Sequence, residues 1–186
     1  NTTLSFEFYP PQTKEGVEKL KQTAKDLNQF NPEFFSVTFG AGGSTKEKTL
    51  DTVLDLKKSG FNATPHISCI SSSKAEIKEL LDKYKANKIN HLVALRGDNP
   101  SGSINFGELN YANELVNFIK SEMGDTFKID VGAYPEVHPE SETAKQDFIN
   151  FKNKVEAGAD SAITQFFYNV DAYFKFVDEC QKNSIN

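Results

Sequence analysis

The segment His91-Leu-Val-Ala-Leu-Arg-Gly-Asp-Asn-Pro100 joins an apolar run directly to charged residues. The run Leu92–Leu95 is short and entirely apolar, which is typical of a strand covered on both faces in a parallel sheet. Arg96 and Asp98 follow at once, and the proline ends any further strand pairing. The segment therefore predicts a buried strand with charged groups at its carboxyl end, where α/β proteins place their chemistry.

Arg96 is the only arginine in the sequence, and lysine supplies the other basic side chains of fixed charge. The planar guanidinium binds flat or anionic groups through two parallel hydrogen bonds, which lysine cannot do. We therefore regard Arg96 as a candidate ligand-binding residue. The residue types alone leave open an alternative, a surface ion pair between Arg96 and Asp98.

Composition narrows the class of protein. A chain of 186 residues can bury the core of one domain, and its net charge of −5 argues against nucleic acid or an anionic membrane as a general partner. No apolar run approaches the roughly 18 residues of a membrane span, and we expect no signal peptide, because the N-terminus reads directly into a strand. Cys69 and Cys180 lack metal-ligand spacing and fit free thiols in a reducing compartment, so we expect a cytoplasmic protein.

One pattern repeats along the chain, in which a β-rich apolar run precedes a helical run. The runs that we interpret as strands begin 28 to 38 residues apart, the spacing of βα units. They are Leu4–Tyr9, Phe34–Phe39, Asn62–Ser68, His91–Leu95, Ile129–Tyr134 and Ser161–Phe166.

Capping signals and apolar periodicity predict a helix after each strand. Ser44-x-x-Glu47 and Ser73-x-x-Glu76 have the form of capping boxes that open the second and third helices. The third helix then shows apolar residues at helical spacing from Ile77 to Tyr84, and the sixth is expected to start after Asp171. We interpret these stripes as ordinary core faces.

Six βα units leave two architectures, a doubly wound open sheet and a (β/α)8 barrel. The loop Gly40-Ala-Gly-Gly-Ser44 can either cradle a phosphate at a helix N-terminus or simply form a turn. The barrel is favoured because six polar residues stand at or just after the ends of six different strands, whereas an open sheet would gather them at one switch point. These residues are Glu7, Thr38, His66, Asp98, Tyr134 and Gln165. We predict an α/β fold of the (β/α)8 TIM-barrel class, with about six βα units in a single partial barrel domain over residues 1–186.

Several of these residues suit catalysis or binding, each with a plainer alternative. Glu7 between two phenylalanines would have a raised pKa suited to a general acid, or would lie on a solvated edge. His66 is more often a hydrogen-bonded core residue than a catalyst, and without a partner at ligand spacing we predict no metal. The loop from Tyr134 to Glu140 is a candidate binding wall, and Gln165 suits a heterocycle or is a satisfied amide.

Six motifs in register resemble the flavin-dependent catalytic domain of methylenetetrahydrofolate reductase. They are Ser5-Phe-Glu-Phe-Tyr-Pro-Pro11, Ser36-Val-Thr-Phe-Gly-Ala41, Pro65-His-Ile-Ser-Cys69, Leu95-Arg-Gly-Asp98, Ala133-Tyr-Pro-Glu-Val-His-Pro139 and Ala162-Ile-Thr-Gln-Phe-Phe167. The resemblance implies a barrel that holds FAD and reduces 5,10-methylenetetrahydrofolate to 5-methyltetrahydrofolate with NADH or NADPH. This oxidoreductase reaction belongs to one-carbon and methionine metabolism.

The resemblance also implies roles for individual residues. Glu7 and Asp98 match the catalytic residues, and Gln165, Asp98 and Thr38 match positions that contact the folate. One flavin position, usually basic in the family, is Asn153 here, which puts that contact in doubt. The remaining expected flavin contacts are Thr38, Phe39, Ala41, His66, Arg96, Gly97, Asp98, Ala112, Tyr134, His138, Asp147, Asn150 and Lys154.

Two other functions remain open on the sequence alone. The chain can be a non-catalytic barrel fragment or accessory subunit that binds flavin or a partner. A flavin-free lyase or aldolase is disfavoured, because no lysine stands at a strand end and no metal ligands cluster. A barrel with about six strands leaves two open edges, so we expect this span alone to be poorly stable or to associate, and we expect a homo-oligomer.

Overall fold

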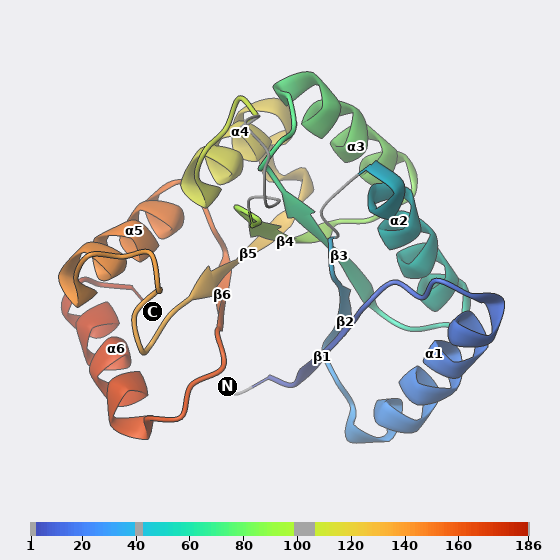
Figure 1. The fold of residues 1–186 in the computed structure, drawn as a ribbon, viewed down its shortest axis with the longest axis horizontal. Coiled ribbons are helices and arrows are strands. Elements are labelled where there is room, and N and C mark those ends of the chain that lie inside the picture. The colour runs from blue at the N-terminus through green and yellow to red at the C-terminus, as the bar shows by residue number, and fades with distance from the viewer. Residues whose placement is uncertain (1–2, 40–42, 99–106, 186) are drawn as a thin grey trace.

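The computed structural model describes residues 3–39, 43–98 and 107–185, and it forms one curled sheet surrounded by helices (Figure 1). All strand pairs are parallel, and the strands lie side by side in the order in which they occur along the chain. A doubly wound sheet would reverse its order partway, so the predicted partial barrel is confirmed. The strands are β1 (Ser5–Phe8), β2 (Phe34–Val37), β3 (Ala63–Ser68), β4 (His91–Leu95), β5 (Lys128–Ala133) and β6 (Ser161–Thr164).

The helices lie on the outside of the curl (Figure 1). Thr13, Ser73, Thr143 and Asn169 cap four of them by accepting backbone N–H bonds with their side chains. The helices are α1 (Lys14–Leu27), α2 (Gly43–Lys58), α3 (Lys74–Ala86), α4 (Ala112–Met123), α5 (Ala144–Glu156) and α6 (Val170–Lys182), with short 3-10 turns at Asn28–Phe30 and Gly124–Thr126.

Two predicted helix starts need correction. The capping box at Ser73 is confirmed, with Glu76 closing it. Ser44, in contrast, lies inside α2, which already begins at Gly43, so it is not the N-cap residue. The sixth helix begins before Asp171, because the Asn169 side chain accepts from the N–H groups of Asp171 and Ala172 and so fixes the start at Val170.

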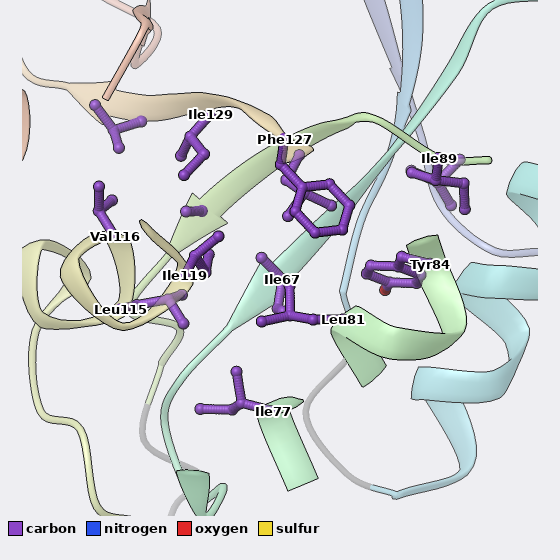
Figure 2. Packing of buried hydrophobic residues seen from close by; sticks show 14 of the residues in the cluster. Ile67, Ile77, Leu81, Tyr84, Ile89, Leu115, Val116, Ile119, Phe127 and Ile129 are labelled. Atoms are coloured by element: carbon purple, nitrogen blue, oxygen red, sulfur yellow. The ribbon is translucent and has the colours of Figure 1, made fainter. Parts of the chain in front are cut away.

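The main core lies between the outer face of the sheet and the helices that cover it. Ile67 and Ile129 point outward from their strands and pack against Ile77, Leu81 and Leu115 of α3 and α4, as Figure 2 shows. Successive strand residues alternate between faces, so the neighbours of these core residues point into the curl. The inside of the curl is therefore the face on which polar strand residues gather.

Four polar side chains from four neighbouring strands meet at the amino ends of the strands. We call Thr64, His91, Asp130 and Ser161 the floor network. Nδ1 of His91 is hydrogen-bonded to the Thr64 hydroxyl at 3.0 Å, and its Nε2 lies 2.8 Å from Asp130 Oδ2. The Ser161 hydroxyl donates to the other Asp130 oxygen, and the edge of the Phe34 ring covers the imidazole. Burial opposes the charge on Asp130, but the hydrogen bonds from His91 and Ser161 outweigh it and lower the Asp130 pKa.

The two ends of the sheet order, β1 and β6, are edge strands, and most side chains of β6 are exposed. Cys69 and Cys180 are free thiols, and Cys69 is buried. Over the described ranges, none of the helices has the length and apolar character needed to cross a membrane.

Candidate active site

The carboxyl ends of the strands surround a cavity of about 610 Å³. Each of the six strands contributes side chains to its wall, either from its last residues or from the residues that follow it. All six polar residues that the sequence placed at strand ends line it: Glu7, Thr38, His66, Asp98, Tyr134 and Gln165. We call these six the rim residues.

Glu7 points into the curl because its two neighbours point outward. Phe6 and Phe8 both stack on Phe35, with ring centroids 6.1 and 5.4 Å apart, and this fixes the alternation of β1. The Glu7 side chain is about half exposed, at 54%, yet its partial burial in the cavity wall raises its pKa. Both sequence readings therefore hold in part: Glu7 lies on an edge strand, and its carboxyl group has a raised pKa.

His66 is the most deeply buried of the titratable rim residues. Burial lowers its pKa to about 4, so the ring is neutral at physiological pH. Its Nε2 makes no hydrogen bond and lies 3.5 Å from Glu7 Oε2, in a geometry that does not form one. The Nε2 atom of this core histidine is buried without a hydrogen-bond partner, and the residue lines the cavity.

Arg96 does not pair with Asp98, which corrects the alternative considered from the sequence. Its guanidinium instead forms two bonds to Glu140, from Nη1 to Oε2 at 2.6 Å and from Nη2 to Oε1 at 3.0 Å. The hydrogen bonds that Arg96 donates to Glu140 raise the Arg96 pKa further, and Asp98 adds only a long-range attraction. Arg96 itself stands beside the cavity, which Gly97 and Asp98 line.

Gly97 is required where it stands. Its φ is +86°, and a Cβ atom there would overlap the Ser68 hydroxyl and come within 2.8 Å of Ile70 Cγ2. The Ser68 hydroxyl uses this close approach to donate to the Arg96 carbonyl at 2.8 Å. The glycine therefore lets the residues after β4 turn across the end of β3, which brings Asp98 to the cavity.

The loop after β5 is folded upon itself. The rings of Tyr134 and His138 meet edge to face at 4.5 Å, and Asp147 accepts from the His138 backbone N–H and from the Ser141 hydroxyl. Val137 has a φ of 74°, which is strained for a β-branched residue. Tyr134 lines the cavity, whereas His138 and Asp147 are not among the described lining residues, and the binding role of the loop stays a prediction.

Lys154 reaches from α5 to the end of β5. Its Nζ donates to the Gly132 carbonyl at 2.5 Å and lies 5.8 Å from the centroids of the Tyr134 and Phe151 rings. Burial lowers its pKa to about 8. The ammonium group is thus next to two lining residues, Gly132 and Tyr134, without lining the cavity itself.

The expected flavin contacts fall into three groups. Thr38, Phe39, His66, Gly97, Asp98 and Tyr134 line the cavity, while Arg96, Ala112, His138, Asp147, Asn150 and Lys154 are not among the described lining residues. Asn150 accepts from Gln146 on the exposed face of α5. Ala41 and most of the glycine-rich loop lie outside the described residues. In the described part of the chain, no three histidine, cysteine or acidic side chains are grouped as for a metal ion.

Sequence reasoning missed two features of this region. Ser68 lines the cavity, and the alternation of Thr64, His66 and Ser68 on β3 was the signal that could have found it. The partner of Arg96 could not be found in this way, because Glu140 follows a different strand and only the folded loop brings it near.

A parallel βα barrel with a polar cavity at the carboxyl ends of its strands is the class of protein that this fold and site define. The chain belongs to the methylenetetrahydrofolate reductase family, whose family model matches residues 1–186. It is 44% identical over 183 residues to 5,10-methylenetetrahydrofolate reductase of Buchnera aphidicola subsp. Schizaphis graminum. It is 43% identical over 184 residues to the protein of the same name from Escherichia coli K12. Each match covers 98% of this chain and 61% of the relative, so the chain spans about three fifths of their length.

A more distant relative and two solved structures extend the comparison. The chain is 38% identical over 199 residues to methylenetetrahydrofolate reductase (NADH) 1 of Arabidopsis thaliana, covering all of this chain and 34% of that protein. A Clostridium thermocellum protein described as binding two copies of 5-methyl-5,6,7,8-tetrahydrofolic acid matches with a TM-score of 0.61 at 15% identity, over 99% of this chain and 63% of that one. The 2,3-dimethylmalate lyase structure matches with a TM-score of 0.59 at 5% identity, over 95% and 62%. At these identities the two structures support the fold alone.

Proposed function

We propose that the protein reduces 5,10-methylenetetrahydrofolate to 5-methyltetrahydrofolate, with FAD as cofactor and NADH or NADPH as electron donor. Family membership supports the reaction class. The observation that carries the proposal is that the cavity gathers Glu7, Asp98 and Gln165, the three residues that match the family's acid, flavin-side carboxylate and folate amide. The chain spans about three fifths of its bacterial relatives, so the activity is proposed for the protein that contains this span.

The residues of the site fit FAD. His66 lines the cavity and has a buried Nε2 with no hydrogen-bond partner, which a heteroatom of the isoalloxazine or ribityl group would satisfy. Arg96 stands beside the cavity and offers positive charge for the diphosphate. The residues that we propose to hold FAD are Thr38, Phe39, Ala41, His66, Arg96, Gly97, Asp98, Ala112, Tyr134, His138, Asp147, Asn150 and Lys154. FAD, when bound, supplies the hydride that the protein itself cannot provide.

Glu7 is the proposed general acid. Opening the imidazolidine ring of the folate requires a proton on the departing nitrogen, and a carboxyl group with a raised pKa can hold that proton near neutral pH. Burial raises the Glu7 pKa in this direction, and the neutral His66 beside it adds no positive charge that would lower it again. The carboxyl group can therefore donate its proton to a folate bound in the cavity.

Asp98 and Gln165 have complementary roles in the proposal. Ring opening leaves a 5-iminium cation on the folate, and the Asp98 carboxylate in the cavity wall would stabilise this charge. The Gln165 carbonyl oxygen accepts from the Phe166 backbone N–H at 2.9 Å, which fixes its amide and leaves the NH₂ group to bind the pterin edge. Thr38, another lining residue, would supply a further hydroxyl to the folate.

The visible absorption spectrum tests this proposal most directly. The protein, purified with whatever sequence accompanies this span, should show oxidised-flavin bands that bleach with NADH or NADPH and return when methylenetetrahydrofolate is added. Tetrahydrofolate, which lacks the methylene bridge, is the matched control and should leave the bleached spectrum unchanged. A colourless protein that takes up no added FAD would overturn the proposal.

Three further expectations stay predictions. They are a cytoplasmic location, which rests on the two free cysteines, a homo-oligomeric state, and a place in methionine metabolism. The organisation of residues 1–186 as one part of a barrel domain is likewise proposed from the single sheet that they form.

A further inference from the structure

We propose that Glu140 is an internal anion that occupies Arg96 until the diphosphate of a dinucleotide ligand displaces it. The identity of that ligand as FAD rests on the proposed function, whereas the exchange of one anion for another at Arg96 does not. In this view Glu140 sets the affinity of the site for phosphate-bearing ligands.

The geometry of the pair is that of a bound anion. Arg96 directs both terminal nitrogens at the two oxygens of Glu140, at 2.6 and 3.0 Å, and its Nε donates to the Gly97 carbonyl at 3.2 Å. The third bond fixes the guanidinium plane independently of Glu140. A phosphate group offers two oxygens at a similar spacing, so it can take the place of the carboxylate without movement of the arginine.

The charge around the cavity makes Arg96 necessary for an anionic ligand. Two carboxylates, Glu76 and Asp98, stand in the cavity wall beside the Glu7 carboxyl group, and no lysine or arginine is found among the described lining residues. Lys154, the nearby cation, donates to the Gly132 carbonyl and has a lowered pKa. A diphosphate that entered this negatively charged region would depend on Arg96, which the carboxylate already holds.

Glu140 can leave without unfolding its loop. The contacts with Asp147 anchor the loop at His138 and Ser141, on either side of Glu140. The Glu140 side chain is 62% exposed, against 26% for Arg96, so rotation about its side-chain bonds carries the carboxylate into solvent. Its backbone N–H remains bonded to the His138 ring at 3.1 Å. The exchange therefore needs a change of rotamer only.

The expected effect follows from the strength of such pairs. An exposed ion pair contributes at most about 1 kcal/mol, so its loss as a competitor should tighten binding of a phosphate ligand by about two- to fivefold. Glu140→Gln removes the charge at constant size. Glu142→Gln removes the same charge from an exposed position in the same segment and is the matched control.

The side-chain Nε–H of Arg96 can be followed as a nitrogen resonance in arginine-labelled protein, where it is assigned by its loss in Arg96→Lys. Inorganic pyrophosphate would be titrated into wild type, Glu140→Gln and Glu142→Gln while this resonance is followed, and FAD binding would be measured in parallel by absorbance. We expect Glu140→Gln to bind both probes about two- to fivefold more tightly than wild type, and Glu142→Gln to match wild type.

The outcomes separate this inference from the proposed function. Equal or weaker pyrophosphate binding by Glu140→Gln, or no binding by any variant, would overturn the exchange even if FAD binds. Tighter pyrophosphate binding by Glu140→Gln in a protein that takes up no FAD would support the exchange and overturn the flavin assignment.

Discussion

Two histidines point into the curl from neighbouring strands, one at the amino end of its strand and one at the carboxyl end. Their ring nitrogens differ strongly in how many hydrogen bonds they form. His91, in the floor network, contacts Thr64 through one ring nitrogen and Asp130 through the other. His66, at the rim, has a buried Nε2 with no hydrogen bond and is only 3.5 Å from Glu7. The amino end of the curl thus completes its own polar contacts, whereas the carboxyl end leaves polar atoms for a ligand.

This difference indicates that, on the inner face of the sheet, the amino end contributes to stability and the carboxyl end to function. A buried polar network that is fully paired rigidifies the strands that it joins, and breaking it leaves charged or polar atoms without partners. An unpaired buried nitrogen costs free energy in the unliganded protein, and this cost is recovered when a ligand supplies the missing bond. Substitutions at the amino end should therefore lower the free energy of unfolding, whereas substitutions at the carboxyl end should alter catalysis or ligand binding and can raise it.

The largest expected effect is on catalysis at the rim. Glu7→Gln removes the proposed proton donor, so folate reduction should slow by about 10²- to 10⁴-fold while flavin reduction by NAD(P)H is unchanged. Stopped-flow absorbance of the two half-reactions measures this. Glu76→Gln is the control, because it alters another carboxylate of the cavity wall and glutamine still closes a capping box. Unchanged folate reduction in Glu7→Gln would refute the acid assignment.

At the floor, the largest effect should be on stability. His91→Leu leaves Asp130 as a buried carboxylate without its imidazole partner, and we expect the free energy of unfolding to fall by about 3 kcal/mol. Urea denaturation followed by circular dichroism measures this. Asp51→Ala, at an exposed helix position, should change stability by less than about 0.5 kcal/mol. A loss for His91→Leu no greater than that control would mean that the network contributes nothing.

The matching change at the rim should have the opposite sign. His66→Leu removes a buried nitrogen that has no hydrogen bond, so the unliganded protein should gain about 1 kcal/mol in the free energy of unfolding. FAD should then bind more weakly, because the proposed contact is lost. Thermal denaturation with and without FAD tests both effects. A destabilised His66→Leu would show that packing of the imidazole outweighs its unsatisfied nitrogen.

The smallest effect is a difference in pH dependence between the two ends. The Asp130 pKa is lowered in the folded state, so its stabilising contribution is present above the ordinary aspartate pKa of about 3.9 and is lost as the pH falls through the lowered value. The Glu7 pKa is raised, so its contribution is present below the ordinary glutamate pKa and is lost as the pH rises through the raised value.

Urea denaturation between pH 3 and 7 separates these contributions. Glu7→Gln should be more stable than wild type at pH 7, by an amount that shrinks toward pH 4. In Asp130→Asn, the free energy of unfolding should fall less than in wild type as the pH is lowered. A constant difference between Glu7→Gln and wild type across this range would show that the Glu7 pKa is not raised.

Local patterns predicted most of the fold and the rim. The strand His91–Leu95 was predicted with its observed bounds, since its apolar run and the charged residues after it are adjacent in the sequence. The rim residues could be found because each follows a recognisable strand. The start of α2 was misplaced, because a serine three residues before a glutamate has the same pattern whether it precedes a helix or lies within its first turn.

The floor network and the Arg96–Glu140 pair were not predicted, and both for the same reason. Each joins side chains that are far apart in the sequence, and the residue types alone do not predict which side chains will be in contact. His91 follows an asparagine in an unremarkable turn, and Asp130 stands in the middle of an apolar strand, so only the stagger of neighbouring strands brings them to 2.8 Å. Contacts of this kind follow from the curvature of the sheet.

The order of the strands has a consequence for synthesis on the ribosome. Each strand pairs with the one made just before it, so the sheet can be extended one unit at a time as the chain emerges, without waiting for distant segments. The floor network forms in the same order, and Ser161 of β6 supplies its last member. Nascent chains that end before β6 would carry Asp130 without this hydroxyl, and the emergence of the sixth strand would complete the network and lock the growing sheet.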